Sequence, residues 1–195
     1  MIWGIVLAAG MGRRIGTPKA HLTLFGRTFL DRAVDALSGA GLEVVVVMNP
    51  GVTAAIPADA LKARRVVNPD PDGDNGMFGS VKLGVSEALK FGAKGVLLLP
   101  VDLPLVTDED VRAVVTRLSA GAGVVVATHG GRRGHPIGIS REVMDEIVAA
   151  SSVATLRDIV RRDPGRVVEV PVSEGAVVGV NTREDLERVS NRTFR

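Results

Sequence analysis

The chain has 195 residues, a formal net charge of +2 and no cysteine. A chain of this length buries about 70% of its unfolded surface, so we expect one domain over residues 1–195. The lack of cysteine excludes disulfides, thiolate nucleophiles and cysteine-bound zinc. Lysine and arginine form no continuous run, and the apolar runs are too short to cross a bilayer. We therefore expect a cytoplasmic protein with neither a nucleic-acid nor a membrane partner.

Apolar runs alternate with helical segments along the whole chain. Residues 44–47 and 96–99 are apolar at every position, which is typical of parallel strands covered on both faces. We expect strands at residues 2–8, 43–48, 64–67, 95–100, 122–128, 136–139, 166–171 and 176–180. We expect helices at residues 28–39, 78–91, 107–119, 141–150, 153–162 and 183–191. This alternation predicts an α/β fold, a three-layer α/β/α Rossmann-like domain with a mostly parallel sheet. Ligands in such sheets bind beyond the C-terminal ends of the strands.

The loop after the first strand is rich in glycine and basic residues. Residues 7–19 read Leu-Ala-Ala-Gly-Met-Gly-Arg-Arg-Ile-Gly-Thr-Pro-Lys. Gly10 and Gly12 let backbone N–H groups approach an anion closely. Arg14 and Lys19 add positive charge beside those groups. The loop therefore predicts a binding site for a nucleoside triphosphate.

The spacing in this loop separates three kinds of phosphate site. A dinucleotide fingerprint needs a third glycine where Ile15 stands. An ATPase loop needs lysine directly after Gly16, but two residues intervene before Lys19. The remaining pattern, L-A-A-G-x-G-x-R-[MI]-G-x-P-K, resembles the signature loop of nucleotidyltransferases that activate small phosphates with an NTP. A merely flexible glycine loop is the alternative. The resemblance implies nucleotide contacts from Leu7, Ala8, Ala9, Gly10, Gly12, Arg14 and Lys19.

An aspartate follows the fourth expected strand. Asp102 stands between Pro100 and Pro104 at the C-terminal tip of that strand. Mg²⁺ prefers one or two carboxylates together with phosphate oxygens and water. If the first and fourth strands are neighbours, Asp102 faces the triphosphate and can hold such an ion. The alternative is that Asp102 only caps a turn before the helix that starts near Thr107.

Two other segments carry polar groups into the expected site. Asn75 and Ser80 flank a helix start, where exposed N–H groups and the hydroxyl suit a base, ribose or phosphate. An ordinary serine near a helix start is the equal alternative. Residues 131–137 form a short, basic segment, in which Arg133 and His135 suit contact with an acidic acceptor. Neighbouring arginines would lower the pKa of His135, so we assign it to substrate contact rather than acid–base catalysis.

Together these segments resemble the molybdenum cofactor cytidylyltransferases over nearly the whole chain. The matching segments are Leu7-Ala8-Ala9-Gly10, Asn75-Gly-Met with Ser80, Asp102-x-Pro104-Leu105-Val106, Gly134-His135-Pro136 and Asn181-Thr-Arg-Glu-Asp185-Leu. The resemblance implies transfer of CMP from CTP to molybdopterin, with Mg²⁺ (Mn²⁺ as the alternative ion), and release of pyrophosphate. The product would pass to a molybdoenzyme. Related guanylyltransferases usually carry Leu-Ala-Gly-Gly in the first motif, so Ala9 favours CTP.

The same resemblance implies the role of each residue. Arg14 would draw charge from the leaving pyrophosphate, Lys19 would stabilise the α-phosphate, and Asp102 with Asn181 would hold the metal ion. Two positions depart from the family pattern, because Asn181 replaces a common aspartate and Leu103 a common glutamine. Three alternatives therefore stay open: a guanylyltransferase on the same pterin, a sugar- or polyol-phosphate nucleotidyltransferase, and a nucleotide-binding regulator without catalysis.

Overall fold

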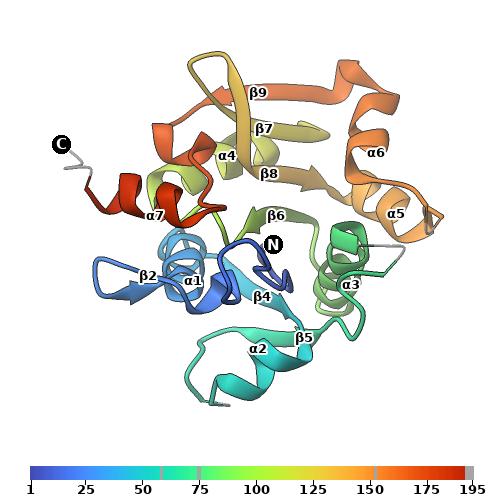
Figure 1. The fold of residues 1–195 in the computed structure, drawn as a ribbon. Helices are drawn as coiled ribbons and strands as arrows, with labels where there is room; N and C mark the ends of the chain where they lie inside the picture. Colours follow the sequence, from blue (N-terminus) through green and yellow to red (C-terminus); the bar gives the residue numbers. More distant parts are fainter. Residues whose placement is uncertain (58, 74–75, 152, 192–195) are drawn as a thin grey trace.

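A seven-stranded sheet forms the centre of the computed structural model, which describes residues 1–57, 59–73, 76–151 and 153–191. The strand order is β5-β4-β1-β6-β8-β7-β9 (Figure 1). The strands are β1 (Ile2–Ala8), β4 (Glu43–Met48), β5 (Arg64–Val67), β6 (Gly95–Pro100), β7 (Val124–His129), β8 (Arg132–Ser140) and β9 (Val167–Pro171). Strand β8 is antiparallel to β6 and β7, and the other neighbouring strands are parallel. The expected mostly parallel sheet is confirmed.

Helices cover both faces of this sheet (Figure 1). One face carries α1 (Phe29–Gly39), α4 (Asp108–Ser119) and α7 (Arg183–Ser190), and the other carries α3 (Gly76–Lys90), α5 (Arg141–Ala149) and α6 (Leu156–Arg162). Strand residues alternate between two buried clusters, so that Val6 and Leu99 face the first layer while Ile5 and Leu98 face the second. The three-layer α/β/α arrangement is therefore as predicted. Within the described part of the chain, no helix has the length and apolarity needed to span a membrane.

Helix caps explain where the structure moves the expected boundaries. Thr28 accepts the N–H of Asp31 and starts α1 as predicted. The helix expected from residue 153 begins only at Leu156, because Thr155 is its cap and forms a capping box with Asp158. The sequence reading missed α2 (Pro50–Ala55), which Asn49 caps, and a small hairpin of β2 (Thr23–Leu24) and β3 (Arg27–Thr28).

The strand expected at residues 176–180 is wrong. The chain forms a 3₁₀ turn there, η3 (Glu174–Val177), and then an irregular segment. Ser173 caps this turn through the N–H of Gly175. A Cβ on Gly175 would lie 2.3 Å from the carbonyl oxygen of Leu105. The segment thus packs tightly against the loop after β6 instead of joining the edge of the sheet.

The direction of the strands brings distant residues to one edge. Strands β1 and β6 are neighbours and parallel, as the placement of Asp102 required. Strand β8 runs the other way, so its first residues lie at the edge where β1 and β6 end. The glycine loop, Asp102 and the start of β8 therefore meet at the same edge.

Candidate active site

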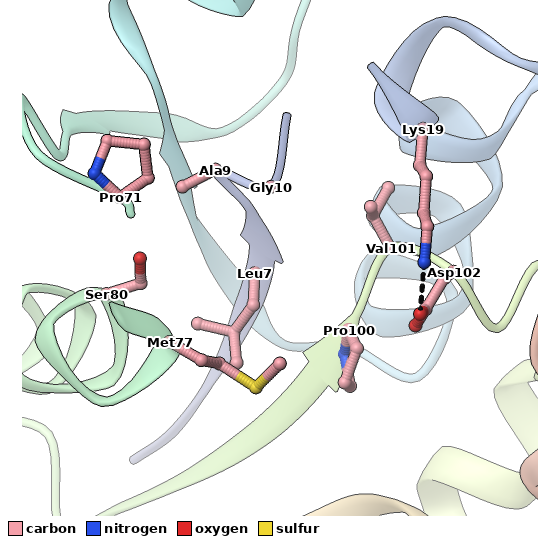
Figure 2. Close-up of a pocket in the computed structure, with 10 residues that line it drawn as sticks. All are labelled: Leu7, Ala9, Gly10, Lys19, Pro71, Met77, Ser80, Pro100, Val101 and Asp102. Atoms are coloured by element: carbon pink, nitrogen blue, oxygen red, sulfur yellow. Dashed lines mark hydrogen bonds and ion pairs between the residues drawn. The ribbon is translucent and has the colours of Figure 1, made fainter. Parts of the chain in front are cut away.

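A cavity of about 260 Å³ opens where β1 and β6 end (Figure 2). We call it the main cavity. Lys19 and Asp102 stand on one side of it, and Met77 and Ser80 from α3 stand on the other (Figure 2). The described residues that line it are Leu7, Ala9, Gly10, Lys19, Pro71, Met77, Ser80, Pro100, Val101 and Asp102.

The glycine loop turns tightly beside the main cavity. Gly12 has φ +61°, and a Cβ on it would lie 2.0 Å from the carbonyl oxygen of Thr17, so a larger residue does not fit. The carbonyl oxygen of Gly12 accepts the N–H groups of Ile15 and Gly16. Gly10 has open space where its Cβ would be and lines the main cavity. The loop therefore leaves exposed backbone beside a space that a phosphate chain can enter.

The three residues before Gly10 do not all face the site. Leu7 and Ala9 line the main cavity, whereas the side chain of Ala8 packs into the core on the opposite face. Alternation along a strand causes this difference, so the nucleotide contact predicted for Ala8 is limited to its backbone.

Asn49 was missed as a contributor to the site. It is 2% exposed, donates its Nδ2 to the carbonyl oxygen of Ala9 at 2.9 Å, and accepts the N–H of Val52 at its Oδ1. The same side chain thus holds the chain at the end of β1 and caps α2. The signal was present, since Asn followed by Pro is a common start of a helix.

Lys19 links the glycine loop to two side-chain oxygens, which accept hydrogen bonds from its ammonium group. Its Nζ donates to Asp102 Oδ2 at 2.8 Å and to Asn181 Oδ1 at 2.6 Å. A carboxylate oxygen and an amide oxygen around one cation are a donor set that also fits Mg²⁺ or Mn²⁺. Across the described residues, no group of three or more His, Cys, Asp or Glu side chains is arranged so that it could hold a metal ion. A metal ion here would therefore need phosphate oxygens and water as further ligands.

The fold holds Asn181 beside Asp102 by backbone contacts. The N–H of Val180 donates to the carbonyl oxygen of Asp102 at 2.8 Å, and Asp185 accepts the N–H of Asn181 at 2.9 Å. Asp102 does not cap the following helix, because Thr107 does so with Asp110 in a capping box. The carboxylate of Asp102 contacts Lys19, which lies outside the turn, so the structure does not favour the alternative that Asp102 only caps a turn.

Asp110 also connects the segment after β6, which carries Asp102, with the segment after β9, which leads to Asn181. Its buried carboxylate accepts the N–H and the hydroxyl of Ser173, each at 2.8 Å. Leu103, which stands where the family commonly has glutamine, is buried in the core beneath this loop. Its packing role accounts for an apolar residue at that position.

Of the remaining predicted residues, Ser80 lines the main cavity, whereas Arg14 and Arg133 do not. Ser80 is 3% exposed, accepts Asn68 Nδ2 at 2.9 Å and lines the main cavity. Asn75 lies outside the described residues. Arg14 is exposed and lines neither the main cavity nor the cavity that contains His135. Arg133 is also exposed, and its Nε donates to Glu169 of β9 at 2.7 Å, so the structure directs it away from the site.

His135 lies near Asp102 at the start of β8. Burial lowers its pKa to about 4, while the charge of Asp102 opposes this shift. The direction is as predicted, but the expected cause, the neighbouring arginines, was wrong. A Cβ on the preceding Gly134 would lie 1.9 Å from the carbonyl oxygen of Ala176, so this strand start packs directly against η3. His135 is neutral near neutral pH and can contact a ligand without repelling a cation.

Comparison with known proteins places this architecture in a family. Residues 4–167 match the model of the MobA-like NTP transferase domain. The chain belongs to this family. The predicted membership is confirmed, and this MobA-like protein is a nucleotidyltransferase.

Curated relatives and solved structures resemble the chain over nearly its whole length. A molybdenum cofactor guanylyltransferase of Rhizobium meliloti (strain 1021) is 26% identical over 94% of this chain and 88% of its own length. Another, of Rhodobacter capsulatus, is 29% identical over 98% of this chain and 96% of its own. The crystal structure of Rv0371c from Mycobacterium tuberculosis H37Rv superposes with a TM-score of 0.81 at 23% identity, covering 99% of this chain and 100% of that one. A structure of Rv0371c in complex with manganese gives 0.75, at 24% identity, over 98% and 99% of the two chains. The two curated relatives carry guanylyltransferase names, so they favour the guanylyl alternative over the cytidylyl reading.

Proposed function

We propose that this MobA-like protein transfers GMP from GTP to the phosphate of molybdopterin and releases pyrophosphate. The observation that carries the proposal is the contact of Lys19 with both Asp102 and Asn181, at the edge of a cavity that the glycine loop borders. The choice of GTP and of molybdopterin rests on the names of the two curated relatives.

The reaction needs positioning and charge neutralisation rather than a covalent enzyme intermediate. A phosphate oxygen of the acceptor attacks the α-phosphorus of GTP. The new oxygen–phosphorus bond forms as the bond to the bridging oxygen of pyrophosphate breaks, and that oxygen leaves with the electron pair. Backbone N–H groups around Gly10 and Gly12 would hold the triphosphate in the main cavity. Lys19 would stabilise the charge on the α-phosphate oxygens.

Asp102 and Asn181 would hold the metal ion, Mg²⁺ or Mn²⁺. When bound, such an ion would neutralise the negative charge of the phosphates. Arg14, which lies exposed on the loop, would contact the leaving pyrophosphate. His135, being neutral, would contact the acceptor near Asp102.

CTP is the second candidate nucleotide because Ala9 lines the main cavity, where relatives that use GTP usually have glycine. Thermal unfolding with GTP, CTP, ATP and UTP, each with and without Mg²⁺ or Mn²⁺, separates the candidates. A ligand at a hundred times its Kd adds about 2.7 kcal/mol to the free energy of unfolding. We expect the largest metal-dependent shift with GTP. A shift confined to CTP would reverse the choice of nucleotide.

Pyrophosphate release with molybdopterin then tests catalysis. We expect release that depends on the protein, on GTP and on the divalent ion. A protein that binds GTP but releases no pyrophosphate with any acceptor would be a nucleotide-binding regulator.

A further inference from the structure

The turn η3 packs against two segments that carry residues of the candidate site, the loop after β6 and the start of β8. A Cβ on Gly175 of this turn would lie 2.3 Å from the carbonyl oxygen of Leu105, in the loop after β6. A Cβ on Gly134, at the start of β8, would lie 1.9 Å from the carbonyl oxygen of Ala176 in the turn. Neither contact leaves room for a side chain, so the turn is held closely against both segments.

Beyond η3 the chain leads directly into the candidate metal site. The N–H of Val180 donates to the carbonyl oxygen of Asp102 at 2.8 Å, and Oδ1 of the next residue, Asn181, accepts Lys19 Nζ at 2.6 Å. Asp102 and Asn181 therefore come from segments that lie far apart in the sequence. The distance between their oxygens depends on how firmly residues 173–181 are held against the loop after β6.

A side-chain bridge fastens the start of this segment. Asp110, in the first turn of α4, is 4% exposed. Its Oδ1 accepts the N–H of Ser173 and its Oδ2 accepts the hydroxyl of Ser173, each at 2.8 Å. The oxygen of that hydroxyl accepts the N–H of Gly175 at 3.2 Å. Hydrogen bonds to a carboxylate are about twice as strong as those to a neutral acceptor. We call these contacts between Asp110 and Ser173 the anchor.

The anchor is more than a helix cap. Asp158 also stands in a capping box, at the start of α6, where it is exposed and accepts the N–H and the hydroxyl of Thr155. Asp110 caps α4 with Thr107 in the same way, but it is buried and also bonds Ser173, 63 positions away. The comparison separates the local role of such an aspartate from the long-range role of Asp110.

We propose that Asp110 and Ser173 are positioning residues, which set the distance between the oxygens of Asp102 and Asn181 and thereby the affinity of this pair for a divalent ion. Two oxygens held at a fixed distance lose less conformational freedom on binding an ion than two oxygens on independently moving segments. This inference rests on the proposed function, to which it adds the residues that hold the metal site together.

Ser173→Ala tests the anchor with little disturbance elsewhere. It removes the hydroxyl that Asp110 accepts and leaves the capping box of Thr107 with Asp110 in place. Ser173 is exposed, so the change opens no cavity in the core. Ser173→Thr keeps the hydroxyl and is the conservative variant. Ser38→Ala is the matched control, because Ser38 is also exposed and its hydroxyl bonds the carbonyl oxygen of Asp35 within α1.

The affinity for Mn²⁺, measured by electron paramagnetic resonance of the free ion, is the first readout and needs no turnover. We expect Ser173→Ala to weaken Mn²⁺ binding by at least about fivefold, because the segment that carries Asn181 is no longer anchored. Ser173→Thr and Ser38→Ala should stay within about twofold of the wild type. An affinity of Ser173→Ala within that range, or a wild type that binds no Mn²⁺, would overturn the inference.

A double-mutant cycle tests whether Ser173 acts through Asn181. Asn181→Ala removes the amide oxygen that the anchor is proposed to place. Ser173→Ala should then weaken Mn²⁺ binding by less than about twofold when it is added to Asn181→Ala, because two changes that act through one contact are not additive. An equal loss of affinity in both backgrounds would mean a general effect on the fold and would overturn the inference.

Pyrophosphate release separates this inference from the proposed function. We expect Ser173→Ala to need about fivefold more metal ion for half-maximal turnover, with a smaller change in kcat at saturating metal. A larger loss in kcat than in metal affinity would overturn the inference. A wild type that binds Mn²⁺ but releases no pyrophosphate would reject the proposed function, while the Mn²⁺ affinities would still decide whether Asp110 and Ser173 position the two oxygens.

Discussion

Lys19 Nζ lies 2.8 Å from Asp102 Oδ2 although the two residues are 83 positions apart in the chain. The ammonium group compensates the carboxylate and contacts Asn181 at the same time. A divalent cation that used these two oxygens would meet the like charge of Lys19. The geometry therefore predicts that Lys19 and a metal ion compete for Asp102 until nucleotide phosphates arrive to bind both.

Replacing the lysine tests this competition. Lys19→Met removes the ammonium group, so we expect the protein to bind Mn²⁺ alone about tenfold more tightly. Turnover should nevertheless fall by about 10² to 10³, because the charge opposite the α-phosphate is lost. Electron paramagnetic resonance of free Mn²⁺ measures the affinity. Weaker binding of Mn²⁺ by this variant would contradict the competition.

Lys19 contacts the carboxylate of Asp102 and the amide oxygen of Asn181, and Asp102→Asn removes the negative charge of this pair. We expect turnover to fall by about 10² to 10³ and the metal-dependent part of the nucleotide-induced Tm shift to disappear. The Tm of the unliganded variant should stay close to that of the wild type, because the carboxylate is partly exposed. Asp108→Asn is the control, since Asp108 lies in the first turn of α4 and pairs with Arg112. Equal turnover of Asp102→Asn and wild type would reject a role for Asp102.

Asn181→Asp adds a second carboxylate beside Asp102. We expect affinity for Mg²⁺ and Mn²⁺ to rise by about tenfold, because the amide oxygen is replaced by a charged one. Isothermal titration calorimetry with each metal ion measures the change in affinity. Unchanged affinity would show that Asn181 does not face the ion.

His135 should make the free energy of unfolding depend on pH. Its pKa falls from 6.5 to about 4 on folding because the ring is buried. Between these values the unfolded chain binds a proton that the folded protein does not, so stability decreases as the pH falls from 6.5 toward 4. The slope from this group is at most about 1.4 kcal/mol per pH unit, and it ends below the folded pKa. Urea unfolding of wild type and His135→Gln measures it. A variant whose stability falls as steeply as that of the wild type in this window would exclude His135 as the cause.

Gly175→Ala tests how η3 is held against the loop after β6. The added Cβ would lie 2.3 Å from the carbonyl oxygen of Leu105, so backbone must shift. We expect a loss of about 1–3 kcal/mol in the free energy of unfolding. Gly39→Ala is the matched control, since the nearest atom to its Cβ would be 3.4 Å away. Equal stability of the two variants would mean that the contact at Gly175 relaxes without cost.

The sequence predicted the parts of the fold that local patterns encode. Continuous apolar runs located β4 and β6, and the helices expected at residues 28–39, 107–119 and 183–191 correspond to α1, α4 and α7. The segment after β9 was misread because its apolar residues resemble a strand, while the contact of Gly175 with Leu105 that makes it a turn is long-range.

The same limit applies to the site. Lys19 and Asp102 were found by motif and strand position, and the structure brings them together. The direction of a side chain was not predictable, since Ala8 faces the core and Arg133 turns to Glu169. The helix cap at Asn49 had a local signal, but its contact with Ala9 and the contact of Asp110 with Ser173 were missed, because a contact that joins two distant segments has no signature in either segment alone.

The antiparallel strand β8 brings residues from the C-terminal half of the chain to the edge of the sheet at which β1 and β6 end. The glycine loop follows β1, His135 lies on β8, and β6, with Asp102 just after its end, lies between these two strands. If the proposed nucleotidyl transfer holds, substitutions around residues 131–135 would change the part of the site at His135 and leave the glycine loop, on the other side of β6, intact. One sheet thus brings together two segments of the candidate site that can change independently in sequence.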